Sequence, residues 1–380
     1  MFVDLTPEQR RLRDEVREYF GGLITPVERE AMLTDRHGEI YRAVVRRMGS
    51  DGWLGVGWPV EYGGRGFGQV EQQIFVNEAA RADVPLPYVT LQTVGPTLQR
   101  FGTAEQKEFF LPRILAGDLH FAIGYTEPDA GTDLASLRTK AVLDGEHYVV
   151  NGQKIFTTGG HDADYVWLAC RTGPAEARHK AITILIVDTT AAGYSWTPII
   201  TCDGAHHVNA TYYSDVRVPV GMRVGEENGG WRLITTQLNH ERVMLGPAGR
   251  IAVLLDRVHE WAVPRGLLRH ADVRRAFAEV RAVLWVNELL NWQVASGPVE
   301  VADASATKVF AADRTQRVGR LLEEVVGRHG DLSDPETAEL VRWLDVQSRR
   351  NLVLTFGGGV NEVQRELVAS IGLGLPRVVR

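Results

Sequence analysis

Cysteine is scarce in this sequence of 380 residues. It has only Cys170 and Cys202, too few for a disulfide framework, which makes a reducing compartment the simpler location. Long apolar runs are also lacking: the longest candidate, residues 181–187, is the length of a strand, whereas a bilayer span needs roughly 20 residues. The chain opens MFVDLTPEQRR, charged from its fourth residue, without the apolar segment of a signal peptide. We therefore expect a cytoplasmic protein.

Neither sign of charge dominates. The chain has 42 Lys and Arg against 48 Asp and Glu, a net charge of −6, and no long block of like charge. This argues against broad binding to nucleic acid or to an anionic membrane. Hydrophobic residues make up 44% and charged residues 24%, which excludes wholesale disorder. At about 150 residues per domain, the length predicts two or three domains or one large core.

The two ends of the chain are predicted to be helical. Residues 1–119 form an N-terminal helical domain whose first helix is introduced by Thr6 and Gln9, a capping-box pair. Residues 228–380 consist of long helical segments with short links, typical of an antiparallel bundle. The segments expected there are 229–262, 271–296, 300–328, 335–356 and 360–371.

The middle of the chain, residues 120–227, is predicted to be a β domain. Short strand-like runs follow one another without intervening helices, and the dipeptides Asp144-Gly145 and Asn151-Gly152 are tight-turn signals. This pattern indicates an antiparallel β-barrel or sandwich. A Rossmann domain is disfavoured, because its parallel strands require helical crossovers. The predicted fold class is therefore α+β and multidomain.

A carboxylate interrupts an apolar stripe at the start of the C-terminal region. Eight residues spaced alternately three and four apart share one helix face, and the only polar one is Glu241. Two structural explanations are open: an arginine from another helix pairs with Glu241, or Gly246-Pro247 kinks the helix and the carboxylate reaches water. The functional interpretation is a base, since desolvation disfavours the charged carboxylate and makes it a better proton acceptor. The stripe comprises Trp231, Ile234, Leu238, Glu241, Leu245, Ala248, Ala252 and Leu255.

Several segments together resemble the acyl-CoA dehydrogenase family. YTEPDAGTD at residues 125–133 resembles the flavin-binding signature, and NGQKIFTT at 151–158 follows at the family's usual distance. DVRVP at 215–219, GEENGGW at 225–231 and NEVQR at 361–365 continue in the family's order. The resemblance spans nearly the whole chain. It implies a helical domain, a β-barrel and a C-terminal helical bundle, in agreement with the plan above.

The resemblance implies FAD as the cofactor and an acyl-CoA thioester as the substrate. In the family, a base removes a proton from the carbon α to the thioester carbonyl, and a hydride passes from the β carbon to the flavin. The base is a glutamate either in a glycine-rich loop before the last helix or immediately before an arginine on the first helix of the C-terminal domain. This chain has Gly358 at the first place and Glu241-Arg242 at the second. The resemblance therefore implies that Glu241 is the catalytic base.

Further site residues are implied by the same resemblance. Asn239 and Arg242 match positions that contact CoA, although a surface ion pair is an open alternative for Arg242. An aromatic side chain at Phe156 can pack on the flavin ring, but it lacks the indole N–H of the tryptophan that many members have there. A single hydroxyl in such a segment is more often bonded to backbone, so only the joint motif favours the flavin. No metal is expected. The residues matched to the flavin are Tyr125, Thr126, Gly131, Thr132, Phe156 and Thr158.

The half-site that a family subunit donates to its neighbour's flavin looks degraded. In family homotetramers, the neighbour's C-terminal domain holds the adenine half with an Arg-x-x-Phe-Gly motif and a later glycine loop. This chain has Arg265-Gly266-Leu267-Leu268 instead, and residues 323–336 lack the glycine loop. Val360 also stands where the family usually has threonine. We therefore expect the chain to need a different subunit to complete its FAD site.

That arrangement is known in actinobacterial heterotetrameric acyl-CoA dehydrogenases that degrade steroid side chains. The chain resembles their catalytic subunit, notably at residues 210–219, 237–243 and 354–366. We therefore expect an α2β2 assembly with a homologous second subunit, a steroid side-chain CoA ester as substrate and an electron-transfer flavoprotein as acceptor. The triplet Gly357-Gly358-Gly359 leaves room for a bulky acyl group, although it also suits an anion at the start of the last helix.

Three rival interpretations are open. The chain could be a non-catalytic subunit of the same fold, against which Glu241 and the intact flavin signature argue. It could also be an oxidase that passes electrons to oxygen, which the sequence does not distinguish. A metal site built on Cys202, Asp203 and the two adjacent histidines, His206 and His207, is the weakest, because zinc-type sites usually pair two separated ligand couples.

Overall fold

The computed structural model describes residues 4–244, 246–297 and 300–376, and the side chains of Thr34 and of residues 238–244 lie outside that description. The chain divides into two compact units, each assembled from separate stretches of sequence. The first comprises Met1–Thr25, Gly68–Leu86 and Glu241–Arg380, and the second comprises Pro26–Phe67 and Pro87–His240. Among the described residues, no helix combines the length and apolarity needed to cross a membrane.

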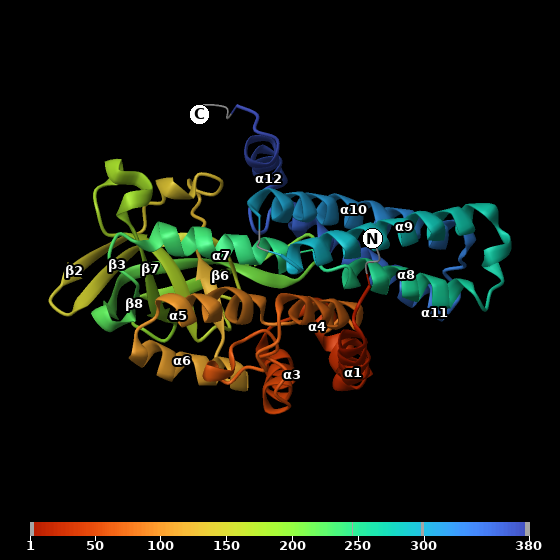
Figure 1. Ribbon diagram of the computed structural model, residues 1–380, viewed down its shortest axis with the longest axis horizontal. Coiled ribbons are helices and arrows are strands. Elements are labelled where there is room, and N and C mark those ends of the chain that lie inside the picture. The colour runs from red at the N-terminus through yellow and green to blue at the C-terminus, as the bar shows by residue number, and fades with distance from the viewer. Residues whose placement is uncertain (1–3, 245, 298–299, 377–380) are drawn as a thin grey trace. The chain divides into compact units, whose positions relative to one another are not determined.

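The second unit contains the β-sheet and four of the helices that precede it in the sequence (Figure 1). Its glycine-rich segment, residues 52–67, is mostly irregular, with one short 3-10 turn at Val60–Tyr62. The sequence reading missed α2 and the helical stretch that ends in α5. The helices of this unit are α2 (Pro26–Thr34), α3 (Gly38–Ser50), α5 (Gly95–Phe101) and α6 (Ala104–Ala116), and α7 (Gly230–Met244) begins in it.

The strands form one sheet in the order β6-β7-β3-β2-β4-β5-β8, with β1 paired to β4. The pairings are mostly antiparallel, but β1–β4 and β2–β4 are parallel. The bounds are β1 (Phe121–Gly124), β2 (Lys140–Asp144), β3 (His147–Thr158), β4 (Tyr165–Arg171), β5 (Ile182–Asp188), β6 (Tyr194–Ile200), β7 (His206–Pro219) and β8 (Arg223–Val224).

The sequence predicted an antiparallel β-barrel, and the observed sheet is neither closed nor wholly antiparallel. In the described part of the chain, β6 and β8 end the strand order and do not pair with each other. One physical reason is that β8 is only two residues long and pairs with β5 alone. Another is that β2 and β4 meet through a single residue pair, Lys140 and Arg171, so the sheet is weakly joined at its centre. It is an open mixed sheet.

The predicted turn at Asn151-Gly152 is also wrong. Both residues lie inside β3, whereas Asp144-Gly145 does join β2 to β3 as expected. Asn151 Nδ2 donates to Asp215 Oδ1 at 2.9 Å, and Asp215 N donates to Asn151 Oδ1 at 3.0 Å. A register shift between Val150 and Gly152 marks the place where β7 carries an extra residue. The dipeptide therefore belongs to a bulge, where the long-range partner strand overrides the local turn preference.

The first unit is helical, as predicted for both ends of the chain (Figure 1). The capping box that introduces α1 is confirmed: Thr6 Oγ1 accepts from Gln9 N at 3.2 Å, and Gln9 Oε1 accepts from Thr6 N at 3.0 Å. Within this unit α10 packs against α8, α9, α11 and α12. The bounds are α1 (Pro7–Leu23), α4 (Gln69–Arg81), α8 (Gly249–Ala262), α9 (Ala271–Ala295), α10 (Val301–His329), α11 (Pro335–Asn351) and α12 (Asn361–Leu367).

The single helix predicted over 229–262 is broken. α7 ends at Met244 and α8 begins at Gly249. Proline has no N–H, so Pro247 cannot continue the helical hydrogen-bond ladder. The Gly246 carbonyl is satisfied from outside instead, by the side-chain amides of Asn287 at 3.0 Å and Asn291 at 3.1 Å. The apolar stripe around Glu241 therefore does not run along one continuous helix.

Candidate active site

Two segments of the second unit, predicted separately to contact a flavin, lie against each other. Ile155 N, next to Phe156 on β3, donates to Thr126 O at 2.8 Å. A Cβ on Gly131 would lie 3.7 Å from Thr126 Cγ2, so the loop folds back on Thr126. The structure thus brings together Thr126, Gly131 and Phe156, with Thr132 and Thr158 next along their segments.

Phe156 projects from a second bulge in β3. Between Lys154 and Thr157 the strand advances one residue more than its partner β7. Phe156 has φ 58°, a left-handed conformation that bulky residues rarely adopt and that costs of order 1–3 kcal/mol. The residue is 60% exposed, whereas Lys154 and Thr157 on either side of the bulge are buried. The bulge therefore presents an aromatic ring and, two residues later, the exposed Thr158 on the outside of the sheet.

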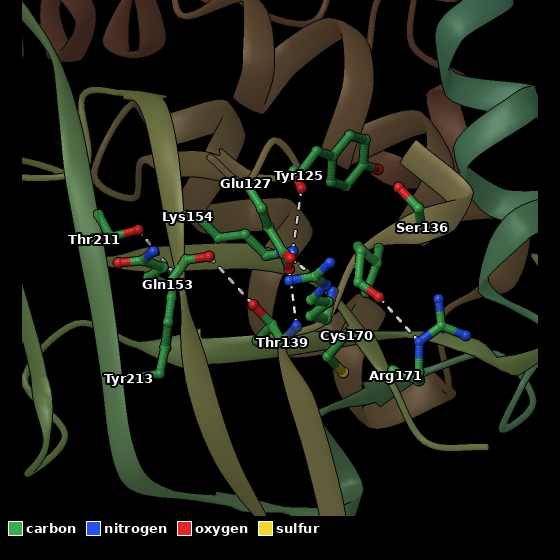
Figure 2. Close-up of polar contacts among 12 residues, drawn as sticks. Tyr125, Glu127, Ser136, Thr139, Gln153, Lys154, Cys170, Arg171, Thr211 and Tyr213 are labelled. Atoms are coloured by element: carbon green, nitrogen blue, oxygen red, sulfur yellow. Dashed lines mark hydrogen bonds and ion pairs between the residues drawn. The ribbon is translucent and has the colours of Figure 1, made fainter. Parts of the chain in front are cut away.

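A buried ion pair lies directly before this bulge. Lys154, 0% exposed, donates from Nζ to Glu127 Oε1 at 2.7 Å and to the Tyr125 carbonyl at 3.1 Å. Figure 2 shows the lysine lying between these two residues. Glu127 also accepts from Arg138 N at 2.6 Å and from Thr139 N at 2.9 Å. Both charged residues lie in the two predicted flavin-binding segments, but the sequence alone assigned them no role.

Electrostatics keep this carboxylate ionised. Burial alone raises the pKa of Glu127, but the Lys154 ammonium and the N–H donors outweigh it, so its pKa lies below the ordinary value. Burial lowers the pKa of Lys154, and the charge of Glu127 opposes that effect. The two opposite charges thus stabilise each other inside the sheet, where the other hydrogen bonds of Glu127 and Lys154 complete their partners.

Tyr125 is engaged within the protein. Its hydroxyl donates to Gln237 Oε1 on α7 and accepts from Trp167 Nε1 at 3.2 Å. Its carbonyl accepts a hydrogen bond from Lys154, so Tyr125 ties the loop that contains Thr126 to β3. Gln237 is one helical turn before Glu241 on α7. The side chains of Asn239, Glu241 and Arg242 lie outside the described residues, so their predicted roles stay predictions.

The glycine triplet of the first unit is held by another buried lysine. Lys308 on α10 donates from Nζ to Gly359 O and to Asn361 Oδ1, both at 2.8 Å. Gly358 and Gly359 have φ of 65° and 92°, so a side chain at either place would be strained. Sequence reasoning missed Lys308. A signal was available, because it shares a helical stripe of α10 with the buried Ala304, Ala311 and Thr315.

Arg265, the arginine matched to the family's donor motif, is occupied within its own chain. Its Nη2 bonds Asp334 Oδ2 at 2.5 Å and Glu336 Oε2 at 2.8 Å. These acids belong to the segment that takes the place of the expected glycine loop. Hydrogen bonds that Arg265 donates to Glu336 and Asp334 raise the pKa of Arg265, and hydrogen bonds from Thr337 and from the same arginine lower the pKa of Asp334.

A cluster of imidazoles borders the end of β3. The His37 ring centroid lies 5.0 Å from that of His161 and 5.9 Å from that of His207, while His161 stacks on His206 at 4.0 Å. Burial and the neighbouring imidazoles lower the pKa of His37 to about 3. Among the described residues, no three acidic, histidine or cysteine side chains are arranged to hold a metal ion, which leaves the rival metal interpretation without support.

Comparison with known proteins identifies the family. The sequence matches the acyl-CoA dehydrogenase N-terminal domain over residues 6–118, the middle domain over 122–216 and the C-terminal domain over 228–373. The chain belongs to the acyl-CoA dehydrogenase family. It is therefore an oxidoreductase, and, like the other members, it uses FAD.

Similar proteins cover the whole length of this acyl-CoA dehydrogenase. Acyl-CoA dehydrogenase FadE29 of Mycobacterium tuberculosis is 69% identical over 387 residues, covering 100% of both chains. A crystal structure of the ChsE4-ChsE5 complex from Mycobacterium tuberculosis matches with a TM-score of 0.91 at 51% identity, again over 100% of both chains. The Tcur3481-Tcur3483 steroid ACAD matches with a TM-score of 0.94 at 49% identity and the same coverage.

The residues of the second unit fit an isoalloxazine. The exposed Phe156 offers a flat apolar surface on which a planar ring can pack. Among the described residues, the hydroxyls of Thr126 and Thr158 make no side-chain hydrogen bond, so they are available to the heteroatom edge of a ring. Phe156 and these hydroxyls would hold the flavin, which supplies the hydride acceptor of the dehydrogenation.

Proposed function

We propose that this chain is the catalytic subunit of an α2β2 acyl-CoA dehydrogenase acting on a steroid side-chain CoA thioester, with Glu241 as the base. The observation that carries the proposal is the backbone of the glycine loop. Gly358 stands where some other members have the base, and its φ of 65° disfavours any side chain there. The other family position for the base is filled by Glu241, on α7.

The chemistry assigned to the chain is simple. Glu241 takes the proton from the carbon α to the thioester carbonyl. FAD, when bound, would supply the acceptor for the hydride of the β carbon, so one substrate hydrogen would go to Glu241 as a proton and the other to the cofactor with two electrons. Asn239 and Arg242 orient the CoA part of the substrate. Phe156 and Thr158 position the flavin and help to exclude water from it, which strengthens the electrostatics of proton removal.

Two observations support a bulky acyl group. The Tcur3481-Tcur3483 protein, 49% identical over the whole chain, is a steroid ACAD. The loop at residues 357–359 carries no side chain beyond hydrogen, and Lys308 holds it in place from α10. Such a loop leaves room where a carboxylate would otherwise project. We propose the steroid side chain as the acyl class for these reasons.

The need for a second subunit is supported by the residues that match the family's motif for the neighbour's flavin. Arg265 is paired with Asp334 and Glu336, so its charge is already neutralised inside the chain. α9 exposes Trp285 by 60% and Leu289 by 48% on one face, an apolar surface that a partner subunit would cover. Two similar structures are of two-component proteins. Electron-transfer flavoprotein is the acceptor we propose.

Flavin stoichiometry tests the assembly. We expect the chain co-purified with its second subunit to hold two FAD per four chains, and the chain alone to hold far less than one per chain. Arg265→Gln is the informative variant: it should lower thermal stability and leave the FAD content of the complex unchanged, because Arg265 serves Asp334 and Glu336. Full occupancy of the lone chain, or loss of FAD in Arg265→Gln, would refute the proposed assembly.

Substrate profiling tests the acyl class separately. Turnover would be measured with straight-chain, branched and steroid side-chain CoA thioesters, using a dye acceptor so that the natural acceptor is not required. We expect the highest kcat/KM with the steroid esters. A preference for straight-chain esters would contradict the proposed substrate while leaving the dehydrogenase assignment intact.

A further inference from the structure

We propose that Lys154 and Glu127 are a positioning pair, which sets the Phe156 bulge against the Thr126 loop so that both present their side chains to the flavin. The inference rests on the proposed roles of Thr126 and Phe156. It assigns to the buried ion pair a part in cofactor geometry in addition to holding the sheet together.

The positioning pair joins two short stretches of backbone. Lys154 Nζ donates hydrogen bonds to the Tyr125 carbonyl at 3.1 Å and to Glu127 Oε1 at 2.7 Å, so it binds the residues on both sides of Thr126. Ile155 N then bonds the Thr126 carbonyl itself at 2.8 Å. Three consecutive residues of the loop are thereby fixed to two consecutive residues of β3, immediately before Phe156. Figure 2 shows Lys154 reaching toward both of its partners.

The Glu127 carboxylate is also held by backbone N–H groups outside the Thr126 loop. Glu127 accepts from Arg138 N and Thr139 N, at 2.6 and 2.9 Å. Its backbone pairs with Ala130 in both directions at 3.1 Å, which closes the loop into a tight turn. Thr139 Oγ1 in turn donates to Gln153 O at 3.3 Å, returning to β3 next to Lys154. The contacts form a closed circuit around Thr126.

The strained backbone at Phe156 explains why these hydrogen bonds are needed. A bulky residue keeps a left-handed φ only where its surroundings over-determine the backbone. On the far side of Phe156, Thr157 O accepts from Asn209 Nδ2 at 3.2 Å, which fixes that end. Lys154 fixes the near end. A buried ion pair is weak evidence for stability alone, since apolar replacements are often tolerated, so its directional contacts are the feature that an apolar pair would not reproduce.

The test compares Lys154→Met, Glu127→Gln and the double variant in the complex with the second subunit. Arg217→Met is the control, because it removes an exposed ion pair with Asp144 from the same sheet. Three quantities are measured: thermal stability, the FAD dissociation constant with the flavin absorption spectrum, and hydrogen exchange of residues 155–158 without added FAD. Lys154→Met should weaken FAD binding roughly tenfold or more and speed that exchange by a similar factor, while Arg217→Met changes neither.

The double variant separates positioning from stability. It leaves no unpaired buried charge, so its thermal stability should recover toward that of the parent. FAD affinity and the absorption spectrum should stay altered, because the directed contact to the Tyr125 carbonyl is gone. Affinity that recovers together with stability, or exchange at residues 155–158 equal to that of Arg217→Met, overturns the inference. A parent complex that binds no FAD would instead overturn the proposed function.

Discussion

His37 makes the stability of the second unit sensitive to acid. Burial and the surrounding His161, His207, His206 and His120 lower its folded pKa to about 3, against an ordinary value of 6.5. Below pH 6.5 the unfolded chain therefore binds a proton that the folded chain rejects, and stability falls. The loss starts as pH drops through 6.5 and continues until about pH 3, where the folded imidazole also takes up the proton.

The magnitude follows from the two pKa values. A pH of 5 lies about 1.5 units below the pKa of the unfolded imidazole, which is therefore protonated, while the folded imidazole is still neutral. This one group therefore lowers the free energy of unfolding by about 2 kcal/mol. His37→Gln removes the titration. We expect the loss of stability between pH 7.5 and pH 5, measured by urea unfolding, to be smaller in this variant by that amount.

The matched control is His179→Gln, an exposed histidine of the same unit. It should show the acid sensitivity of the parent protein. If His37→Gln lost as much stability on acidification as the parent and the control, the imidazole cluster would not be the source of the effect, and the reasoning would be refuted.

Two further predictions concern the first unit. A Cβ at Gly249 would lie 2.0 Å from Asn77 O, so Gly249→Ala should force α8 away from α4 and cost about 1–3 kcal/mol, measured as a lowered Tm; an unchanged Tm would contradict the observed close approach. Lys308→Met removes two charge-assisted hydrogen bonds, to Gly359 O and Asn361 Oδ1, each worth about 1.5–3 kcal/mol. It should speed hydrogen exchange of residues 357–361 and lower kcat/KM, and unchanged exchange would show that the loop holds itself.

Local signals predicted most of the helix starts well. Thr6 and Gln9 form the expected capping box because both partners lie within four residues of each other. Asn151-Gly152 failed for the opposite reason: its conformation is decided by Asp215 on β7, more than sixty residues away. The break at Pro247 lies where the sequence offered a kink as an alternative, yet the stripe alone favoured a continuous helix.

The site shows the same division. Thr126 and Phe156 were found through short motifs, and the structure places their segments in contact. Lys154 and Lys308 were not found, because a lysine in a pattern is normally read as exposed, and only tertiary packing shows that they are buried. The open sheet was also beyond the sequence, since closure depends on which edge strands meet and not on the strands' own patterns.

The most direct test of the account is the reduction of bound flavin by substrate under anaerobic conditions. The FAD-loaded complex would be mixed with a steroid side-chain CoA thioester in a stopped-flow instrument, with Glu241→Gln compared with the parent and with Glu260→Gln, an exposed acid on α8. We predict that Glu241→Gln keeps its FAD content and spectrum but reduces flavin about 10²–10⁴ times more slowly, while Glu260→Gln behaves as the parent. Flavin reduction in Glu241→Gln at the parent's rate would contradict the central claim.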